Sequence, residues 1–188
     1  MSVLTVATFL GLLTLAAFGG VLGTVVVWAL ARIGVTPGAF VTLREAIRPA
    51  VPWLAFVVAA TAMGGSLYFS EAAGFVPCTL CWYQRIAMYP LVLILGIAAV
   101  RGDTGASRYA VPLAGIGAAI SVWHIGVERV PGLPSGSCSL DVPCSTILVQ
   151  VLGFVTIPTM ALAGFGAIIT LLLLGRDRGH DTELEERH

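Results

Sequence analysis

The residues in this sequence with the clearest chemical potential are four cysteines, which occur as two close pairs. Cys78 and Cys81 form a Cys-x-x-Cys motif within PCTLCWYQR, and two thiols at this spacing can close a small, reducible ring. If a helix begins near Pro77, both thiols lie in its first turn, where the helix dipole favours the reactive thiolate. Arg85 follows Cys81 by one helical turn on the same face, so its guanidinium would stabilise a thiolate or another anion formed there. The pattern predicts an activated thiol pair with a cation in reach.

The second pair, Cys138 and Cys144, is separated by five residues in the segment PGLPSGSCSLDVPCS. The repeated Pro and Gly predict a flexible, exposed loop. A disulfide in such a loop is easily attacked, because thiol–disulfide exchange requires access to the sulfur. We therefore interpret all four cysteines as redox-active.

Three other interpretations of the cysteines compete with exchange chemistry. Two inert structural disulfides would be allowed in an oxidising compartment, although short loops on a bundle held by lipid gain little from them. Zinc binding fits poorly, since 56 residues separate Cys81 from Cys138 and the second pair has five intervening residues. Haem attachment needs a histidine after the second cysteine, where Trp82 stands. No metal site is predicted.

The composition indicates that lipid is the solvent of the elements that position these cysteines. Hydrophobic residues make up 57% of the 188 residues and charged residues only 11%, with a mean hydropathy of +0.95. A soluble domain of this size would have about a quarter of its residues charged. The net charge is zero, which gives no indication of nucleic-acid binding.

Long stretches without formal charge predict five transmembrane helices, since a helix needs about 20 apolar residues to cross a bilayer. We place them at roughly 4–31, 51–70, 84–100, 109–127 and 149–174. The predicted fold is an all-α membrane protein, a small bundle of transmembrane helices. The connection 36–50 is either an interfacial helix or a polar linker, and 176–188 is a charged cytoplasmic tail. The first span is too long for a signal peptide and has no positive segment before it.

The arginines predict the orientation of the chain, because short arginine-rich loops stay in the cytoplasm. Five alternating spans place eight of the ten arginines on one side: Arg32, Arg44, Arg48, Arg101, Arg108, Arg176, Arg178 and Arg187. The other side has only Arg85 and Arg129, together with all four cysteines. We predict a multi-pass membrane protein with both cysteine pairs on the extracytoplasmic side.

A histidine near the outer end of the fourth span, His124, has two interpretations. A lone histidine in a helix is usually a packing residue with one hydrogen bond. An ionisable group at membrane depth and close to two redox pairs is a candidate for function. The sequence leaves both open.

Several of these strings resemble the DsbB/BdbC family of disulfide-bond-formation proteins. They are CTLCWYQRIAMYP, the Cys138/Cys144 pair, and GFVTIPTMAL from Gly153 to Leu162. The closely spaced second pair is most similar to the BdbC-like branch, and the resemblance covers about 50–175. It implies a four-helix transmembrane bundle core, 51–175, with one extra N-terminal transmembrane helix within 1–35. It also implies an enzyme of the bacterial cytoplasmic membrane that reoxidises a soluble thioredoxin-like thiol oxidase of the DsbA/BdbD type. The electrons would pass to a membrane quinone, ubiquinone or menaquinone, in support of disulfide formation in exported proteins.

The resemblance also implies a role for each candidate residue. Cys138 matches the cysteine that forms the mixed disulfide with the partner, and Cys144 then resolves it by exchanging with Cys78. Cys81 matches the thiolate that contacts the quinone, and Arg85 the quinone-site arginine. His124 lies where a quinone-proximal histidine is expected.

The sequence departs from the better-known proteobacterial branch of the family in three places. Gln84 stands where that branch carries an acid, the long loop between the cysteines of the second pair is missing, and so is the interfacial segment. The extra first span falls outside the family core. Two other functions remain as alternatives: a reductive relay that moves electrons outward across the membrane, and a non-enzymatic scaffold with structural disulfides.

Overall fold

The apolar stretches form helices, because lipid offers backbone groups no hydrogen-bond partners. The computed structural model describes residues 2–35, 37–130, 133, 138 and 142–176. Its elements are α1 (Val3–Arg32), α2 (Pro37–Ile47), the 3-10 turn η1 (Arg48–Ala50), α3 (Val51–Leu67), the π turn η2 (Tyr68–Ala72), α4 (Thr79–Arg101), α5 (Ser107–Arg129), β1 (Gln150–Val151), β2 (Val155–Thr156) and α6 (Ile157–Gly175). Within the described residues, five helices are long and apolar enough to cross a membrane. The all-α membrane fold is confirmed.

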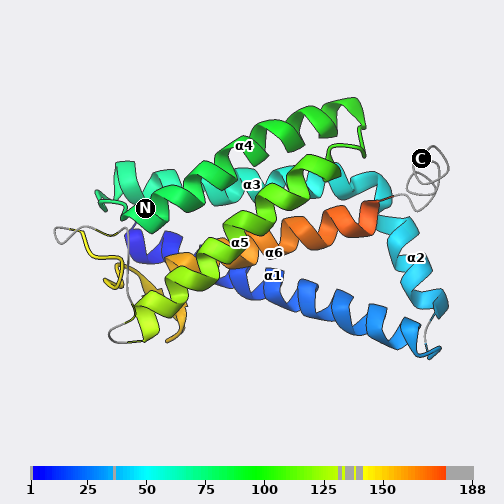
Figure 1. Ribbon diagram of the computed structural model, residues 1–188, viewed down its shortest axis with the longest axis horizontal. Helices are drawn as coiled ribbons and strands as arrows, with labels where there is room; N and C mark the ends of the chain where they lie inside the picture. Colours follow the sequence, from blue (N-terminus) through cyan, green and yellow to red (C-terminus); the bar gives the residue numbers. More distant parts are fainter. Residues whose placement is uncertain (1, 36, 131–132, 134–137, 139–141, 177–188) are drawn as a thin grey trace.

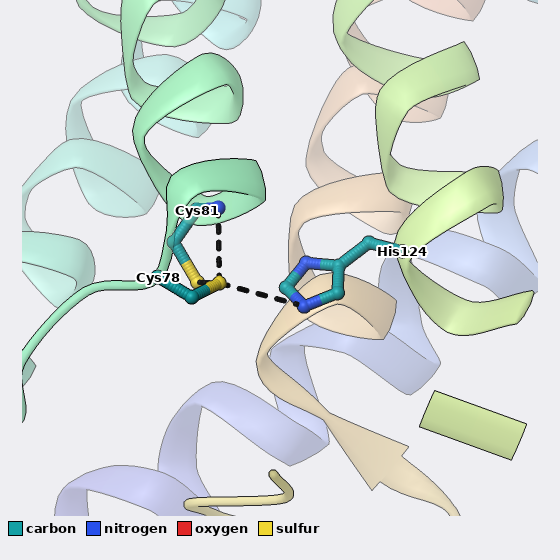
Figure 2. Close-up of side chains that lie close together, drawn as sticks. All are labelled: Cys78, Cys81 and His124. Atoms are coloured by element: carbon teal, nitrogen blue, oxygen red, sulfur yellow. Dashed lines mark hydrogen bonds between the residues drawn. The ribbon is translucent and has the colours of Figure 1, made fainter. Parts of the chain in front are cut away.

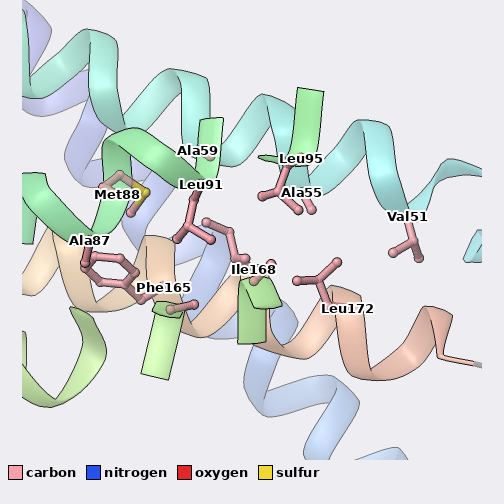
Figure 3. Close-up of a cluster of buried hydrophobic side chains, with 12 residues drawn as sticks. Val51, Ala55, Ala59, Ala87, Met88, Leu91, Leu95, Phe165, Ile168 and Leu172 are labelled. Carbon is pink, nitrogen blue, oxygen red and sulfur yellow. The ribbon is translucent and has the colours of Figure 1, made fainter. Parts of the chain in front are cut away.

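The core of the bundle lies between α3, α4, α5 and α6 (Figure 3). Small residues bring the helix backbones close together, as is usual where lipid gives no hydrophobic drive for association. Larger side chains fill the space between them, and the buried cluster consists of Val51, Ala55, Ala59, Ala87, Met88, Leu91, Leu95, Ala110, Ala114, Phe165, Ile168 and Leu172. Helix α1 packs against α6 and runs towards α2 at the end of the bundle opposite the start of α4 (Figure 1).

The contact between Gly117 of α5 and Phe165 of α6 gives a test of this packing. A Cβ added to Gly117 would overlap Cζ of Phe165, a fully buried ring. Gly117→Ala should therefore lower the stability by about 1–3 kcal/mol. Gly115 lies on the same helix with nothing within 4 Å of its added Cβ, so Gly115→Ala should be neutral or slightly stabilising. Thermal unfolding in detergent measures both, and equal midpoints would contradict the packing.

Two helices begin at positions other than those predicted from charge. Helix α4 begins at Thr79 rather than 84, because Arg85 has partners inside the protein and need not lie at the membrane–water boundary. The last helix begins at Ile157 rather than 149. The residues before it form a hairpin in which Gln150 pairs with Thr156, and its turn has positive φ at Leu152 (54°) and Gly153 (79°). A count of charges cannot distinguish this apolar hairpin from a helix.

The connection between the first two spans is helical, which favours the helix over the linker interpretation. In α2, Arg44 donates a hydrogen bond to the carbonyl of Leu174 at 2.9 Å and another to the carbonyl of Arg176. The guanidinium thereby caps the C-terminal end of α6, where cations are favourable. A position of α2 on the inner leaflet stays a prediction. Apart from Arg176, the predicted tail lies outside the described residues, as does most of the Gly/Pro-rich segment 131–141.

Candidate active site

The first cysteine pair lies at the start of α4, as its spacing predicts. Cys78 is the N-cap residue, and its sulfur accepts a hydrogen bond from the backbone N–H of Cys81 at 3.3 Å. The two sulfurs are 2.9 Å apart, within hydrogen-bond distance of each other. Both residues are free cysteines, Cys78 buried and Cys81 half-buried. The structure thus has a reduced pair held at a helix N-terminus.

The second pair is joined as a disulfide, Cys138–Cys144, with the Cα atoms 5.9 Å apart. Cys144 is only 1% exposed, whereas Cys138 is half-buried. The prediction of an exposed disulfide is therefore wrong for Cys144, because this residue packs into one side-chain cluster with Cys78, Leu80 and Val127. The packing brings both pairs to the same end of the bundle and leaves Cys138 as the more accessible sulfur of the disulfide.

His124 on α5 points towards the first cysteine pair (Figure 2), and it also contacts the backbone of Cys144 in the second pair. Its Nε2 is 3.7 Å from the sulfur of Cys78 and 3.2 Å from the carbonyl oxygen of Cys144, and the ring is 2% exposed. Because a carbonyl can only accept, Nε2 carries a proton. Its Nδ1 lies 3.4 Å from Nε2 of Gln84, whose amide can donate to it. Gln84 thus supports the tautomer in which the histidine donates towards both cysteine pairs.

Arg85 is held between α4 and α3 and does not extend freely to a membrane surface. Its Nε donates to the Ser66 hydroxyl at 2.9 Å, and a terminal nitrogen donates to the Ser66 carbonyl at 2.8 Å. The guanidinium also lies 5.3 Å from the centre of the Trp82 ring. These contacts fix the cation one helical turn from Cys81 and favour a site residue over an interfacial anchor.

A cavity of about 370 Å³ opens beside Cys81 and Arg85. This volume is within the range of small-molecule sites, roughly 300–1,000 Å³. The polar lining includes Cys81, Gln84, Arg85, Ser66 and Ser70, and most of the remaining lining is apolar side chains of α1, α3, α4 and α6. A ligand with a polar ring and a hydrocarbon chain fits this division. A membrane quinone is such a ligand, and Arg85 would supply a donor to a ring oxygen.

The thiol of Cys78, which precedes the membrane span that starts at Thr79, has a lowered pKa. The main cause is the hydrogen bond from the Cys81 thiol; burial opposes the shift, and the contact with His124 adds to it. A lowered pKa keeps the thiolate present until the pH falls well below the ordinary cysteine value of about 8.5.

We accordingly expect the alkylation of Cys78 by iodoacetamide in the reduced protein to change little between pH 8 and pH 6. An ordinary thiol loses about tenfold in rate for each pH unit over this range. Mass spectrometry of the labelled peptide separates Cys78 from Cys81. In His124→Ala the fall in rate should begin at higher pH, because one cause of the shift is removed. A tenfold loss per unit in the unaltered protein would contradict an activated Cys78.

The donor atoms of Cys78, Cys81 and His124 all lie within 4.8 Å of one another, so they could also hold a metal ion. No spacing in the sequence indicates this set, because His124 is 43 residues from Cys81 along the chain. Three donors of this kind leave one position open for a soft metal such as zinc. Local geometry alone allows both redox and metal chemistry.

Sequence reasoning also missed Ser66 and the contribution of Gln84. Ser66 is one of few polar residues in an otherwise apolar span, and this was the available signal. Its partner, Arg85, is 19 residues away, a distance that no local periodicity connects. Gln84 was noticed only as a departure from a family pattern.

Comparison with known proteins identifies one family, which matches most of the chain. The family model described as disulfide bond formation protein DsbB matches residues 48–175. Disulfide bond formation protein C of Bacillus subtilis is 53% identical over 124 residues, which cover 65% of this chain and 89% of that protein. A probable disulfide formation protein of Oceanobacillus iheyensis is 45% identical over 129 residues, 67% of this chain and 89% of the relative. No solved structure matches.

Proposed function

This chain belongs to the DsbB family of disulfide bond formation proteins, and we propose that it works as a membrane thiol oxidase. Its substrate is a soluble thioredoxin-like dithiol protein, which it reoxidises by thiol–disulfide exchange. Its electron acceptor is a membrane quinone, ubiquinone or menaquinone. The observation that carries the proposal is the meeting of both cysteine pairs around His124, beside a cavity that reaches Cys81.

The exchange begins at the accessible sulfur. A partner thiolate attacks Cys138, the Cys138–Cys144 bond breaks, and Cys144 leaves as a thiolate. Cys144 then attacks Cys78 of an oxidised Cys78–Cys81 pair, so that Cys81 leaves as a thiolate beside Arg85. The second partner thiol attacks the mixed disulfide, which releases the oxidised partner and leaves Cys138 reduced.

The Cys138 thiolate next attacks Cys144 in its bond to Cys78. The outer disulfide forms again, and the inner pair now holds two electrons and the protons that accompany them. This is the redox state of the structure, with Cys78 and Cys81 free and Cys138 joined to Cys144. A bound quinone supplies the oxidant for this pair, taking up two electrons and two protons.

His124 and Arg85 support the two thiolates in this sequence. The Nε2–H of His124 is directed towards the Cys78 sulfur and the Cys144 backbone, so it stabilises negative charge where the two pairs exchange. Arg85 provides a fixed positive charge one turn beyond Cys81. Neither group needs to move far, because both are fastened to neighbouring elements.

The deciding experiment is quinone reduction by the purified protein with a reduced thioredoxin-like oxidase as electron donor. We expect one quinone to be reduced for each partner disulfide formed. A chelator should not alter the rate, whereas a metal-binding role for Cys78, Cys81 and His124 predicts that it would. Partner oxidation without any quinone reduction would contradict the proposed acceptor.

The two alternatives are less well supported. A reductive relay needs carriers across the bilayer, and all four cysteines of the sequence lie at one end of the bundle. A scaffold needs structural disulfides, and Cys78 and Cys81 are not joined. Serine replacement separates the scaffold from the oxidase, since a scaffold loses stability and an oxidase loses turnover.

We further propose that the cysteine end of the bundle faces outward from the bacterial cytoplasmic membrane. The basis is the distribution of arginines, eight on one side of the five spans and two on the other. After mild reduction of intact cells, an impermeant maleimide should label Cys138 but not a cysteine introduced at Thr104, between α4 and α5. Labelling of Thr104→Cys with protection of Cys138 would reverse the orientation.

A further inference from the structure

Helix α1 lies outside the residues that match the family, yet it lines the cavity beside Cys81. We propose that α1 forms a tail-binding wall, in which Leu10, Leu13, Thr14 and Ala17 contact the prenyl chain of the quinone. The inference rests on the proposed function, because it takes a quinone as the occupant. It gives the additional helix a specific task in recognition of the acceptor.

The packing of α1 against the bundle is well defined. Its buried residues, Ala7, Gly11 and Thr14, recur at helical spacing on one face. A Cβ on Gly11 would lie 2.7 Å from Cγ2 of Val151 in the hairpin, so the helix backbone approaches closely there. The Thr14 hydroxyl donates to the carbonyl of Leu10 at 2.9 Å and is satisfied within the helix. Small residues thus allow α1 to pack closely against the bundle. The one buried hydroxyl among them, that of Thr14, is hydrogen-bonded.

The contacts of α1 with α3 show which residues of α1 lie beside the reactive groups and which lie further along the cavity. Leu10 lies against Gly65, since a Cβ on that glycine would be 2.8 Å from Cδ1 of Leu10. The next residue, Ser66, binds Arg85. Leu10 is therefore level with the polar end of the cavity. Ala17 is seven residues further along α1, about 10 Å deeper at 1.5 Å per residue.

The lining changes in character along this direction. Around Leu10 it includes the thiol of Cys81 and the cation of Arg85, which suit the ring of a quinone. Towards Ala17 it becomes aliphatic, with Val57 and Val58 of α3 and Ala167 of α6. A chain attached to a ring at the polar end would extend along α1, and a prenyl chain has the required length and apolarity.

The test compares two substitutions one residue apart. Ala17 lines the cavity and is half-buried, whereas Ala16 is exposed on another face of the same helix. We expect Ala17→Trp to weaken the binding of a menaquinone with a short prenyl chain by about tenfold, because the indole would occupy space that the chain needs. Binding of menadione, which has no chain, should change less than about twofold. Ala16→Trp should leave both unchanged.

Binding is measured as the rise in thermal unfolding midpoint with quinone concentration, which does not depend on turnover. A second variant, Leu13→Ala, removes contact without adding bulk and should weaken only the prenylated quinone, by severalfold. Midpoints without quinone and quinone-free exchange at Cys138 report whether each variant is folded.

The possible results separate the two proposals. Equal affinities in Ala17→Trp and Ala16→Trp, or equal losses for menadione and the prenylated quinone in both cavity variants, would overturn the tail-binding wall. A third result is that the variants discriminate between the two quinones only when phospholipid is omitted. That result would assign the cavity to a phospholipid acyl chain and would also overturn the tail-binding wall. If the unaltered protein binds neither quinone, the proposed function fails instead.

Discussion

Replacing Cys144 with serine should stop turnover and accumulate a mixed disulfide between Cys138 and the thioredoxin-like partner. Without the Cys144 thiolate, nothing can carry the electrons from the outer pair to Cys78. The complex forms when the free Cys138 thiolate attacks the disulfide of the oxidised partner, so that one partner sulfur leaves as a thiolate. Cys138 is accessible for this attack, whereas Cys144 is 1% exposed in the unaltered protein. Quinone reduction should fall to the background rate, and the covalent complex should appear on non-reducing gels at the summed mass.

The matched variant, Cys138→Ser, should not trap the partner. Its remaining Cys144 lies within the cluster of Cys78, Leu80 and Val127, where a soluble protein cannot reach it. Mass spectrometry of the cross-linked peptide identifies the sulfur that bonds to the partner. The roles assigned to the two residues would be exchanged if the partner were trapped by Cys144 in Cys138→Ser and not by Cys138 in Cys144→Ser.

The parts of this fold that were predictable are those governed by one dominant force. Lipid requires long apolar helices, and the charge-free stretches therefore locate all five spans. The ends of spans were less predictable, because a charged side chain marks a boundary only when it lacks a partner inside the protein. Arg85 has Ser66, so α4 begins earlier than its charge suggests. The hairpin before α6 is as apolar as a helix and was invisible to the same count.

In the candidate site, the positions set by local helical spacing were predictable, and the contacts between residues far apart in the sequence were not. The positions of Cys78, Cys81 and Arg85 relative to one another follow from helical spacing within eight residues. The contact of His124 with both cysteine pairs depends on how α5 packs against α4 and on the chain after it, which no spacing in the sequence encodes. The contribution of α1 to the cavity could not be predicted either, because it depends on how α1 packs beside α3, α4 and α6.

The contact between Gln84 and His124 gives physical meaning to the departure from the acid of the proteobacterial branch. A carboxylate at this position can only accept a hydrogen bond and would favour a proton on Nδ1. The glutamine amide can donate to Nδ1 and so leaves the proton on Nε2, which points at the sulfur of Cys78. The proton on the cysteine side of the ring is thus supported without placing a second charge in the membrane.

Arg85→Ala should weaken quinone use by about 10- to 150-fold while the Cys138/Cys144 pair still exchanges with its protein substrate. The guanidinium lines the cavity one helical turn beyond Cys81, and Ser66 and Trp82 hold it there. A charge-assisted contact in such a setting contributes about 1.5–3 kcal/mol, which corresponds to this range. Quinone-dependent turnover and quinone-free thiol exchange, measured on the same preparation, separate the two effects.

Arg85→Lys refines this prediction, because it keeps the positive charge and removes the planar fork. The Nε and terminal nitrogen of Arg85 contact the hydroxyl and the carbonyl of Ser66 together, an arrangement that a single ammonium cannot reproduce. Lysine should therefore recover only part of the lost quinone affinity. Equal losses of turnover and of thiol exchange in Arg85→Ala would instead indicate that the bond to Ser66 serves folding. Unchanged quinone kinetics would remove Arg85 from the acceptor site, and the cation would then act only as a link between α3 and α4.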